Sequence, residues 1–192
     1  MTFDEAISRR DLLAMSAAAA LGGSLIRSET ARAAAGPATA RGFDFLHGKW
    51  NVTHRKLKQR LAGSHDWFEF PGTLAVAPIL AGLGNFDENV LSDPNGAYQA
   101  SSLRLFNPGS QRWSIWWLDA RLPAVEPPVV GGFDGSKGTF YAQDVFNDRP
   151  IRVRTTYEPL APDRAQWTQA FSANDGAAWE INWIMDFERS AP

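Results

Sequence analysis

The chain of 192 residues contains no cysteine, which excludes disulfide bonds, thiolate metal sites and a thiol nucleophile. Histidine is scarce as well, with only His47, His54 and His65, and none of the spacings typical of histidine metal sites occurs. The Gly-x-Ser-x-Gly motif of serine hydrolases and the glycine-rich phosphate-binding motifs are also missing. We therefore expect no metal ion and no cofactor, and no known motif assigns a catalytic residue.

The chain also lacks a large excess of charge of either sign. Its formal net charge is −2, and the basic residues are scattered apart from the stretch 55–60. Nucleic acids and anionic membranes are bound by concentrated positive charge, so neither is an expected partner.

The N-terminal segment resembles a twin-arginine export signal. Arg9 and Arg10 precede a weakly apolar, alanine-rich run over 14–26. This run is shorter than the roughly 20 apolar residues that a membrane span requires, so we expect no stable membrane anchor. Small residues that suit signal peptidase lie at 31–35. The predicted organisation is a removed signal peptide over 1–35, a flexible lead over 36–42 and a single domain over 43–192. The predicted location is the periplasm or the exterior, and the precursor's predicted partner is the twin-arginine export machinery.

The rest of the chain has the pattern of an all-β protein. Short runs rich in β-branched and aromatic residues alternate with turn signals such as Asp93-Pro94-Asn95-Gly96, and no stretch shows helical periodicity. The predicted strands are 50–61, 66–77, 86–91, 97–106, 112–118, 129–133, 138–146, 151–157, 165–172 and 179–187. Sequential strands joined by tight turns favour an antiparallel up-and-down β-barrel of about ten strands, closed or nearly closed. A β-sandwich is the alternative.

Two segments at opposite ends of this region carry a family resemblance. Residues 43–52 read Phe-Asp-Phe-Leu-His-Gly-Lys-Trp-Asn-Val, and residues 183–189 read Trp-Ile-Met-Asp-Phe-Glu-Arg. Together they resemble the lipocalin-like, or calycin-like, barrels, and a family of exported bacterial proteins without an assigned activity that begin with Phe-Asp-Phe-x-x-Gly-x-Trp. The resemblance implies that Gly48 and Trp50 begin the first strand and that Arg189 lies across Trp50 to close the barrel, which is a structural role.

Aromatic residues are the main signal for a ligand. The chain has eight Trp and twelve Phe, and strand alternation puts Trp116 and Trp117 on opposite faces, although a filled core needs only one of them. Asp119 follows at the expected barrel mouth, and Glu88 and Arg154 are candidate partners in a buried acid–arginine network. The predicted ligand-binding residues are Trp67, Glu88, Trp116, Trp117, Asp119 and Arg154.

Three functions fit these observations. The first is a binding protein that holds a small apolar or aromatic ligand inside the barrel. The second is a cofactor-independent enzyme, such as an isomerase, hydratase or hydrolase, that uses Glu88 or Asp119 as a base and Arg154 as an electrostatic partner. The third is a structural or partner-binding barrel with a filled interior.

Overall fold

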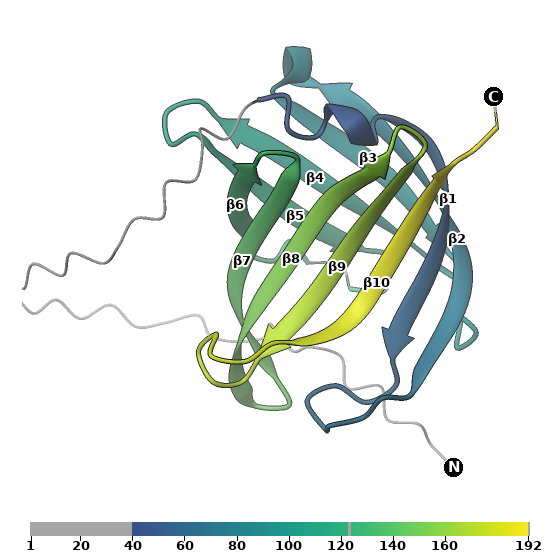
Figure 1. Cartoon of the computed structure of the whole chain (residues 1–192), viewed down its shortest axis with the longest axis vertical. Helices are drawn as coiled ribbons and strands as arrows, with labels where there is room; N and C mark the ends of the chain where they lie inside the picture. Colours follow the sequence, from purple (N-terminus) through teal and green to yellow (C-terminus); the bar gives the residue numbers. More distant parts are fainter. Residues whose placement is uncertain (1–39, 123, 192) are drawn as a thin grey trace, which may run out of the picture.

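Ten antiparallel strands form one closed barrel (Figure 1). The computed structural model describes residues 40–122 and 124–191, so the predicted signal peptide and most of the predicted lead lie outside the described residues. The strands are β1 (Gly48–Leu57), β2 (Trp67–Ile79), β3 (Gly84–Leu91), β4 (Tyr98–Asn107), β5 (Arg112–Asp119), β6 (Val129–Asp134), β7 (Lys137–Phe146), β8 (Arg149–Ala161), β9 (Arg164–Ser172) and β10 (Glu180–Arg189). Each strand pairs with its neighbours in sequence, and β10 pairs with β1. The predicted all-β, up-and-down barrel is confirmed.

Two short 3-10 helices interrupt the pattern, η1 (Asp44–Leu46) before β1 and η2 (Leu80–Gly82) between β2 and β3. Among the residues that the structure describes, no helix is both long and apolar enough to span a bilayer.

Strand alternation determines which side chains point into the barrel. In β1, Val52, His54 and Lys56 are buried, whereas Thr53 is exposed and Arg55 is only partly buried. The same two-residue period runs through β4 and β8, as expected for a sheet with one face on a core and the other in water. Polar residues at the buried positions therefore lie inside the barrel.

One end of the barrel is closed by η1, which lies at the top of Figure 1. The guanidinium carbon of Arg189 lies 4.2 Å from the centre of the Trp50 ring. Arg189 also donates hydrogen bonds to the carbonyl oxygens of His47, Phe45 and Pro162, at 2.7, 2.9 and 3.2 Å. The arrangement of Arg189 across Trp50 that the resemblance implied is present.

Gly48 contributes to the same closure. Its backbone is left-handed, with φ of 112°, and a Cβ atom there would lie 2.8 Å from the Arg189 guanidinium. Any larger residue would be strained and would also press on the stacked arginine.

The opposite end carries the loops that follow β1, β3, β5, β7 and β9. At this end the strand pairing around the barrel is interrupted, because β5 and β6 pair only at 113–115 and 129–131. The interior holds two separate apolar clusters. The larger begins at η1 and reaches Trp183 in β10, while the smaller comprises Phe146, Ile151, Val153 and Phe171 near the loop end.

Candidate functional site

A buried lysine lies in the loop-end half of the barrel. Lys56 points inward from β1, and its residue is only 7% exposed. Its Nζ atom lies 4.2 Å from the centre of the Trp183 ring, with the rings of Phe70 and Tyr98 at 5.1 and 5.4 Å. Three aromatic rings from β10, β2 and β4 thus enclose one amine, which we call the lysine cage.

Two oxygen atoms also contact this amine. Lys56 Nζ donates to the hydroxyl of Tyr98 at 3.0 Å and to the carboxylate of Asp93, in the β3–β4 loop, at 3.4 Å. Burial lowers the pKa of Lys56 to about 8, although Asp93 acts in the opposite direction. Burial also raises the pKa of Tyr98, so its hydroxyl keeps its proton.

His54 lies next to the cage on the same face of β1. Its ring stacks on Phe70 with centroids 4.7 Å apart, and its Nδ1 accepts a hydrogen bond from Trp183 Nε1 at 3.3 Å. The proton of the neutral ring therefore belongs on Nε2, which is buried and has no hydrogen-bond partner. Burial, reinforced by the charge of Lys56, lowers the pKa of His54 to about 3.

Indole rings form a wall beside the lysine cage. Trp183 meets Trp167 and Trp117 edge to face, with centroid distances of 5.2 and 5.8 Å. Trp167 is buried, whereas Trp117 is only partly buried although it points inward. The wall therefore extends from the core to a side chain that solvent reaches.

A charged network lies on the inner face of β3 and β4. Arg104 and Asp87 form an ion pair with 2.6 Å between guanidinium nitrogen and carboxylate oxygen, and both are almost fully buried. Arg104 also donates to Asn85 at 2.9 Å and to the Tyr157 hydroxyl at 3.3 Å. Burial alone would lower the pKa of Arg104, but Tyr157 and Asp87 hold it above its ordinary value.

The other oxygen of Asp87 is engaged too. It accepts hydrogen bonds from the backbone N–H of Ser102 at 2.7 Å and from the Asn89 amide at 3.0 Å. This carboxylate is therefore held by three groups, which suits charge stabilisation better than proton transfer.

Several buried polar atoms of the barrel have no hydrogen-bond partner. They include Asn89 Oδ1, Thr155 Oγ1, Asn182 Nδ2 and Arg104 Nε. Buried polar atoms are nearly always hydrogen-bonded, and each exception in a folded protein requires an explanation.

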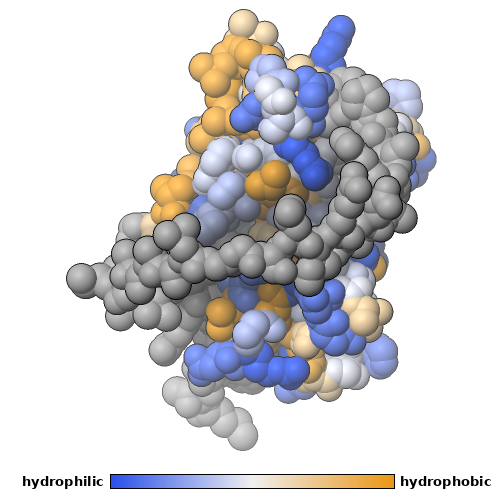
Figure 2. Space-filling view, turned by 90° about the vertical axis from the view of Figure 1, so that its left-hand side faces the viewer, coloured by the Kyte–Doolittle hydropathy of each residue, from blue (hydrophilic) through white to orange (hydrophobic). Residues whose placement is uncertain are grey.

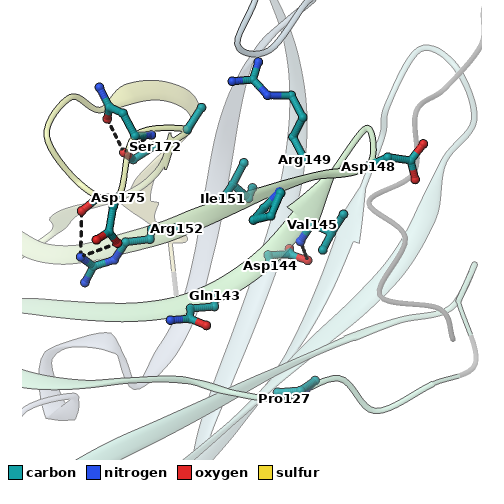
Figure 3. A pocket seen from close by; sticks show the side chains of 13 residues that line it. Pro127, Gln143, Asp144, Val145, Asp148, Arg149, Ile151, Arg152, Ser172 and Asp175 are labelled. Atoms are coloured by element: carbon teal, nitrogen blue, oxygen red, sulfur yellow. Dashed lines mark hydrogen bonds and ion pairs between the residues drawn. The ribbon is translucent and has the colours of Figure 1, made fainter. Parts of the chain in front are cut away.

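Two grooves open at the loop end. The larger, of about 920 Å³, is lined mainly by the β7–β8 hairpin and the β9–β10 loop, with Pro127 on the opposite side (Figure 3). Its lining includes Ile151, which also belongs to the smaller apolar cluster. The second groove, of about 400 Å³, is lined by parts of β4 and β5 and the loop after β5, and includes Asp119.

The outer surface beside the larger groove is mixed in character. Figure 2 shows apolar and hydrophilic side chains in small groups on this side of the barrel. Exposed apolar residues of the β5–β6 loop, β6 and β7 are Val125, Val130, Tyr141 and Val145.

Two of the predicted ligand-binding residues lie near this site. Trp117 is part of the indole wall, and Asp119 lies at the end of β5 where Arg121 donates to it at 2.8 and 3.0 Å. Although burial favours its neutral form, these hydrogen bonds hold the pKa of Asp119 below its ordinary value.

The other four predicted residues lie on the outer face. Trp67 and Trp116 alternate with inward-facing neighbours and are half-buried, and Glu88 is exposed. Arg154 lies outside the barrel with its guanidinium carbon 4.5 Å from the ring of Trp179. Their part in ligand binding stays a prediction, and the interior site does not include them.

The interior residues that were not among the candidates include the charged side chains of Lys56, Asp87 and Arg104. A usable signal was present for Lys56, because alternation from Val52 and His54 places it on the same face.

No group of three or more His, Asp or Glu side chains within 40–122 and 124–191 could hold a metal ion.

Comparisons with known proteins support the fold. No family model and no curated protein matches the chain. An S-type phycobiliprotein lyase from Guillardia theta has a similar structure, with a TM-score of 0.54 and 12% identity over 81% of this chain and 94% of that one. EF1p2_mFAP2b bound to DFHBI aligns over 79% of this chain and 98% of that one, at 11% identity and a TM-score of 0.37. Together with the closed ten-strand barrel, the comparison with the lyase supports a calycin-like fold.

Proposed function

We propose that this protein binds a small, flat, mainly apolar molecule inside the loop-end half of its barrel. The indole wall of Trp117, Trp167 and Trp183 supplies the stacking surface. The observation that carries the proposal is the set of unpartnered buried atoms on inward-facing side chains, above all Asn89 Oδ1 and Thr155 Oγ1. A mainly aromatic interior with a few convergent polar atoms is typical of small-molecule sites.

The other half of the barrel has a filled interior. The Phe43 ring lies 4.9 to 5.6 Å from the rings of Trp113, Phe133, Phe140 and Tyr157. This packing supports a purely structural role for the η1 end and leaves the loop end for a ligand. The fold shared with a phycobiliprotein lyase agrees with a ligand-binding barrel, without bringing that activity to this chain.

The enzyme hypothesis has less support. Asp87 is the most deeply buried carboxylate among the residues described, but Arg104, Asn89 and the Ser102 N–H occupy its oxygens. Glu88 is exposed, and Asp119 is bound by Arg121. We propose binding rather than acid–base catalysis by a carboxylate.

We also propose that the barrel works outside the cytoplasm after twin-arginine export. The paired Arg9 and Arg10 before the alanine-rich run support this location.

Binding is tested with two neighbouring tryptophans. Native mass spectrometry of protein purified from its own host should reveal a bound small molecule, and titration calorimetry with 2-methylnaphthalene should show binding. Trp117→Ala should weaken this affinity at least about tenfold because stacking area is lost. Trp116→Ala is the matched control, since Trp116 lies on the outer face of the same strand. Equal effects of the two variants, or no binding of 2-methylnaphthalene or of any host molecule, would contradict the proposal.

A further inference from the structure

We propose that Lys56 captures ligands that carry an aldehyde or ketone, by forming an iminium ion inside the lysine cage. This inference rests on the proposed function, because the ligand must first enter the aromatic interior. The chain has four lysines, and all lie within the described residues. Lys56 is buried, whereas the exposed lysines are Lys49, Lys58 and Lys137.

The amine of Lys56 is held loosely for a buried ion. Its distance to the Asp93 carboxylate is 3.4 Å, whereas charge-assisted hydrogen bonds are typically about 2.7–2.9 Å. Burying an ammonium group without a close counter-ion is costly, so this position disfavours the charged form. The lowered pKa of Lys56, about 8, agrees with this geometry and leaves about a tenth of the amine neutral at pH 7.

The reaction conserves atoms and charge. The ammonium group releases one proton, and the neutral amine forms a bond to the carbonyl carbon. The oxygen then takes up two protons, one of them from the nitrogen, and leaves as water. A protonated imine replaces the ammonium, so the site still holds one positive charge and no oxidant or reductant is needed.

The residues around Lys56 fit these steps. The Tyr98 hydroxyl, 3.0 Å from Nζ, keeps its proton and can donate it to the carbonyl oxygen during attack. Asp93 remains as the counter-ion of the product. The faces of Trp183 and Phe70 stabilise a cation whether it is an ammonium or an iminium ion.

Lys56 lies close beneath the protein surface. The Arg121 side chain is 44% exposed, and its guanidinium carbon lies 3.6 Å from the centre of the Tyr98 ring. Tyr98 in turn contacts the Lys56 amine. Tyr98 therefore lies between this amine and the exposed Arg121 side chain at the loop end.

The test is reductive trapping with 2-naphthaldehyde and cyanoborohydride on the purified mature protein, followed by peptide mapping. We expect Lys56 to be labelled at least about tenfold faster than Lys58, and Lys56→Arg to abolish this fast labelling. Lys58→Arg is the matched control, because Lys58 is exposed and only two residues away. Tyr98→Phe should slow the labelling of Lys56, because the phenylalanine ring keeps the aromatic cage but has no hydroxyl proton to donate. Thermal unfolding of each variant checks that the barrel is intact.

The outcomes separate this inference from the proposed function. If 2-methylnaphthalene binds but Lys56 is labelled no faster than Lys58, the iminium inference is overturned and the binding function stands. If neither compound binds and labelling is spread evenly over the lysines, both ideas are overturned.

Discussion

The guanidinium of Arg104 lies 2.6 Å from the carboxylate of Asp87, inside a barrel where neither side chain reaches solvent. A buried ion pair rarely adds net stability, because the removal of both charges from water costs about as much as their attraction returns. Its effect is seen when one partner is lost, since the remaining charge is then buried alone. Loss of either side chain, Asp87 on β3 or Arg104 on β4, should therefore destabilise the barrel.

Arg104→Met should reduce the free energy of unfolding by about 3–5 kcal/mol, because the Asp87 charge would be left uncompensated. In Asp87→Asn/Arg104→Met, more than half of this loss should be recovered. The asparagine removes the charge but retains an oxygen for the Ser102 N–H. Urea unfolding followed by circular dichroism measures both values. A double variant less stable than Arg104→Met would show that the Asp87 charge is not destabilising without Arg104, which would contradict this prediction.

His54 predicts a specific loss of stability in acid. Its pKa in the folded protein is lowered to about 3, whereas an unfolded histidine has a pKa of about 6.5. Between these values the unfolded chain binds the extra proton, so stability falls as the pH falls, by up to about 1.4 kcal/mol per pH unit. Urea unfolding from pH 7 to 4 should show a shallower dependence in His54→Asn. His65→Asn is the control, because His65 is exposed. If the free energy of unfolding fell equally steeply with pH in His54→Asn and in the wild type, His54 would not be the source of the acid sensitivity.

The closure of the η1 end depends on one cation. Arg189→Ala should lower the free energy of unfolding by about 1–2 kcal/mol, through loss of three hydrogen bonds and the stacking on Trp50. Arg189→Lys should retain less than half of the stability that Arg189→Ala loses, because an ammonium group cannot stack on Trp50 and also reach three carbonyls. The exposed Arg112→Ala provides the baseline. Full rescue by lysine would mean that charge alone matters.

Export is tested at the paired arginines. Replacing Arg9 and Arg10 together by lysine should leave the precursor in the cytoplasm, because the twin-arginine machinery recognises the arginine pair. Immunoblots of cell fractions would show uncleaved protein inside. Continued export of Arg9→Lys/Arg10→Lys in a host that lacks the twin-arginine machinery would indicate another route.

The fold could be predicted because its signals are local. Alternation and turn residues located all ten strands, and the strand bounds differ by only a few residues in most cases. The differences are largest in β1, which ends four residues before its predicted end, and in β8, which extends from Arg149 to Ala161 although prolines lie at 150 and 159. A register shift between Pro159 and Ala161 accommodates the second proline, which cannot donate a hydrogen bond to a neighbouring strand.

The site could be predicted only in part, because alternation separates two faces without saying which one is inside. Trp116 and Trp117 were correctly placed on opposite faces, but only tertiary structure shows that Trp117 is the inner one. In β3 the inward acid is Asp87, and its neighbour Glu88 is exposed. Arg104, the partner of Asp87, comes from the adjacent strand β4. Pairings across strands depend on register, which a single sequence does not reveal.

The short ladder between β5 and β6 has a consequence for how a guest molecule would come and go. Toward the loop end, β5 has no paired neighbour on the β6 side after Ile115, and β7 has none on that side after Tyr141. Separating this seam would break fewer backbone hydrogen bonds than parting any other pair of adjacent strands. For a molecule that leaves through this seam, the opening of the β5–β6 ladder would set the residence time, and lengthening this one ladder would prolong it.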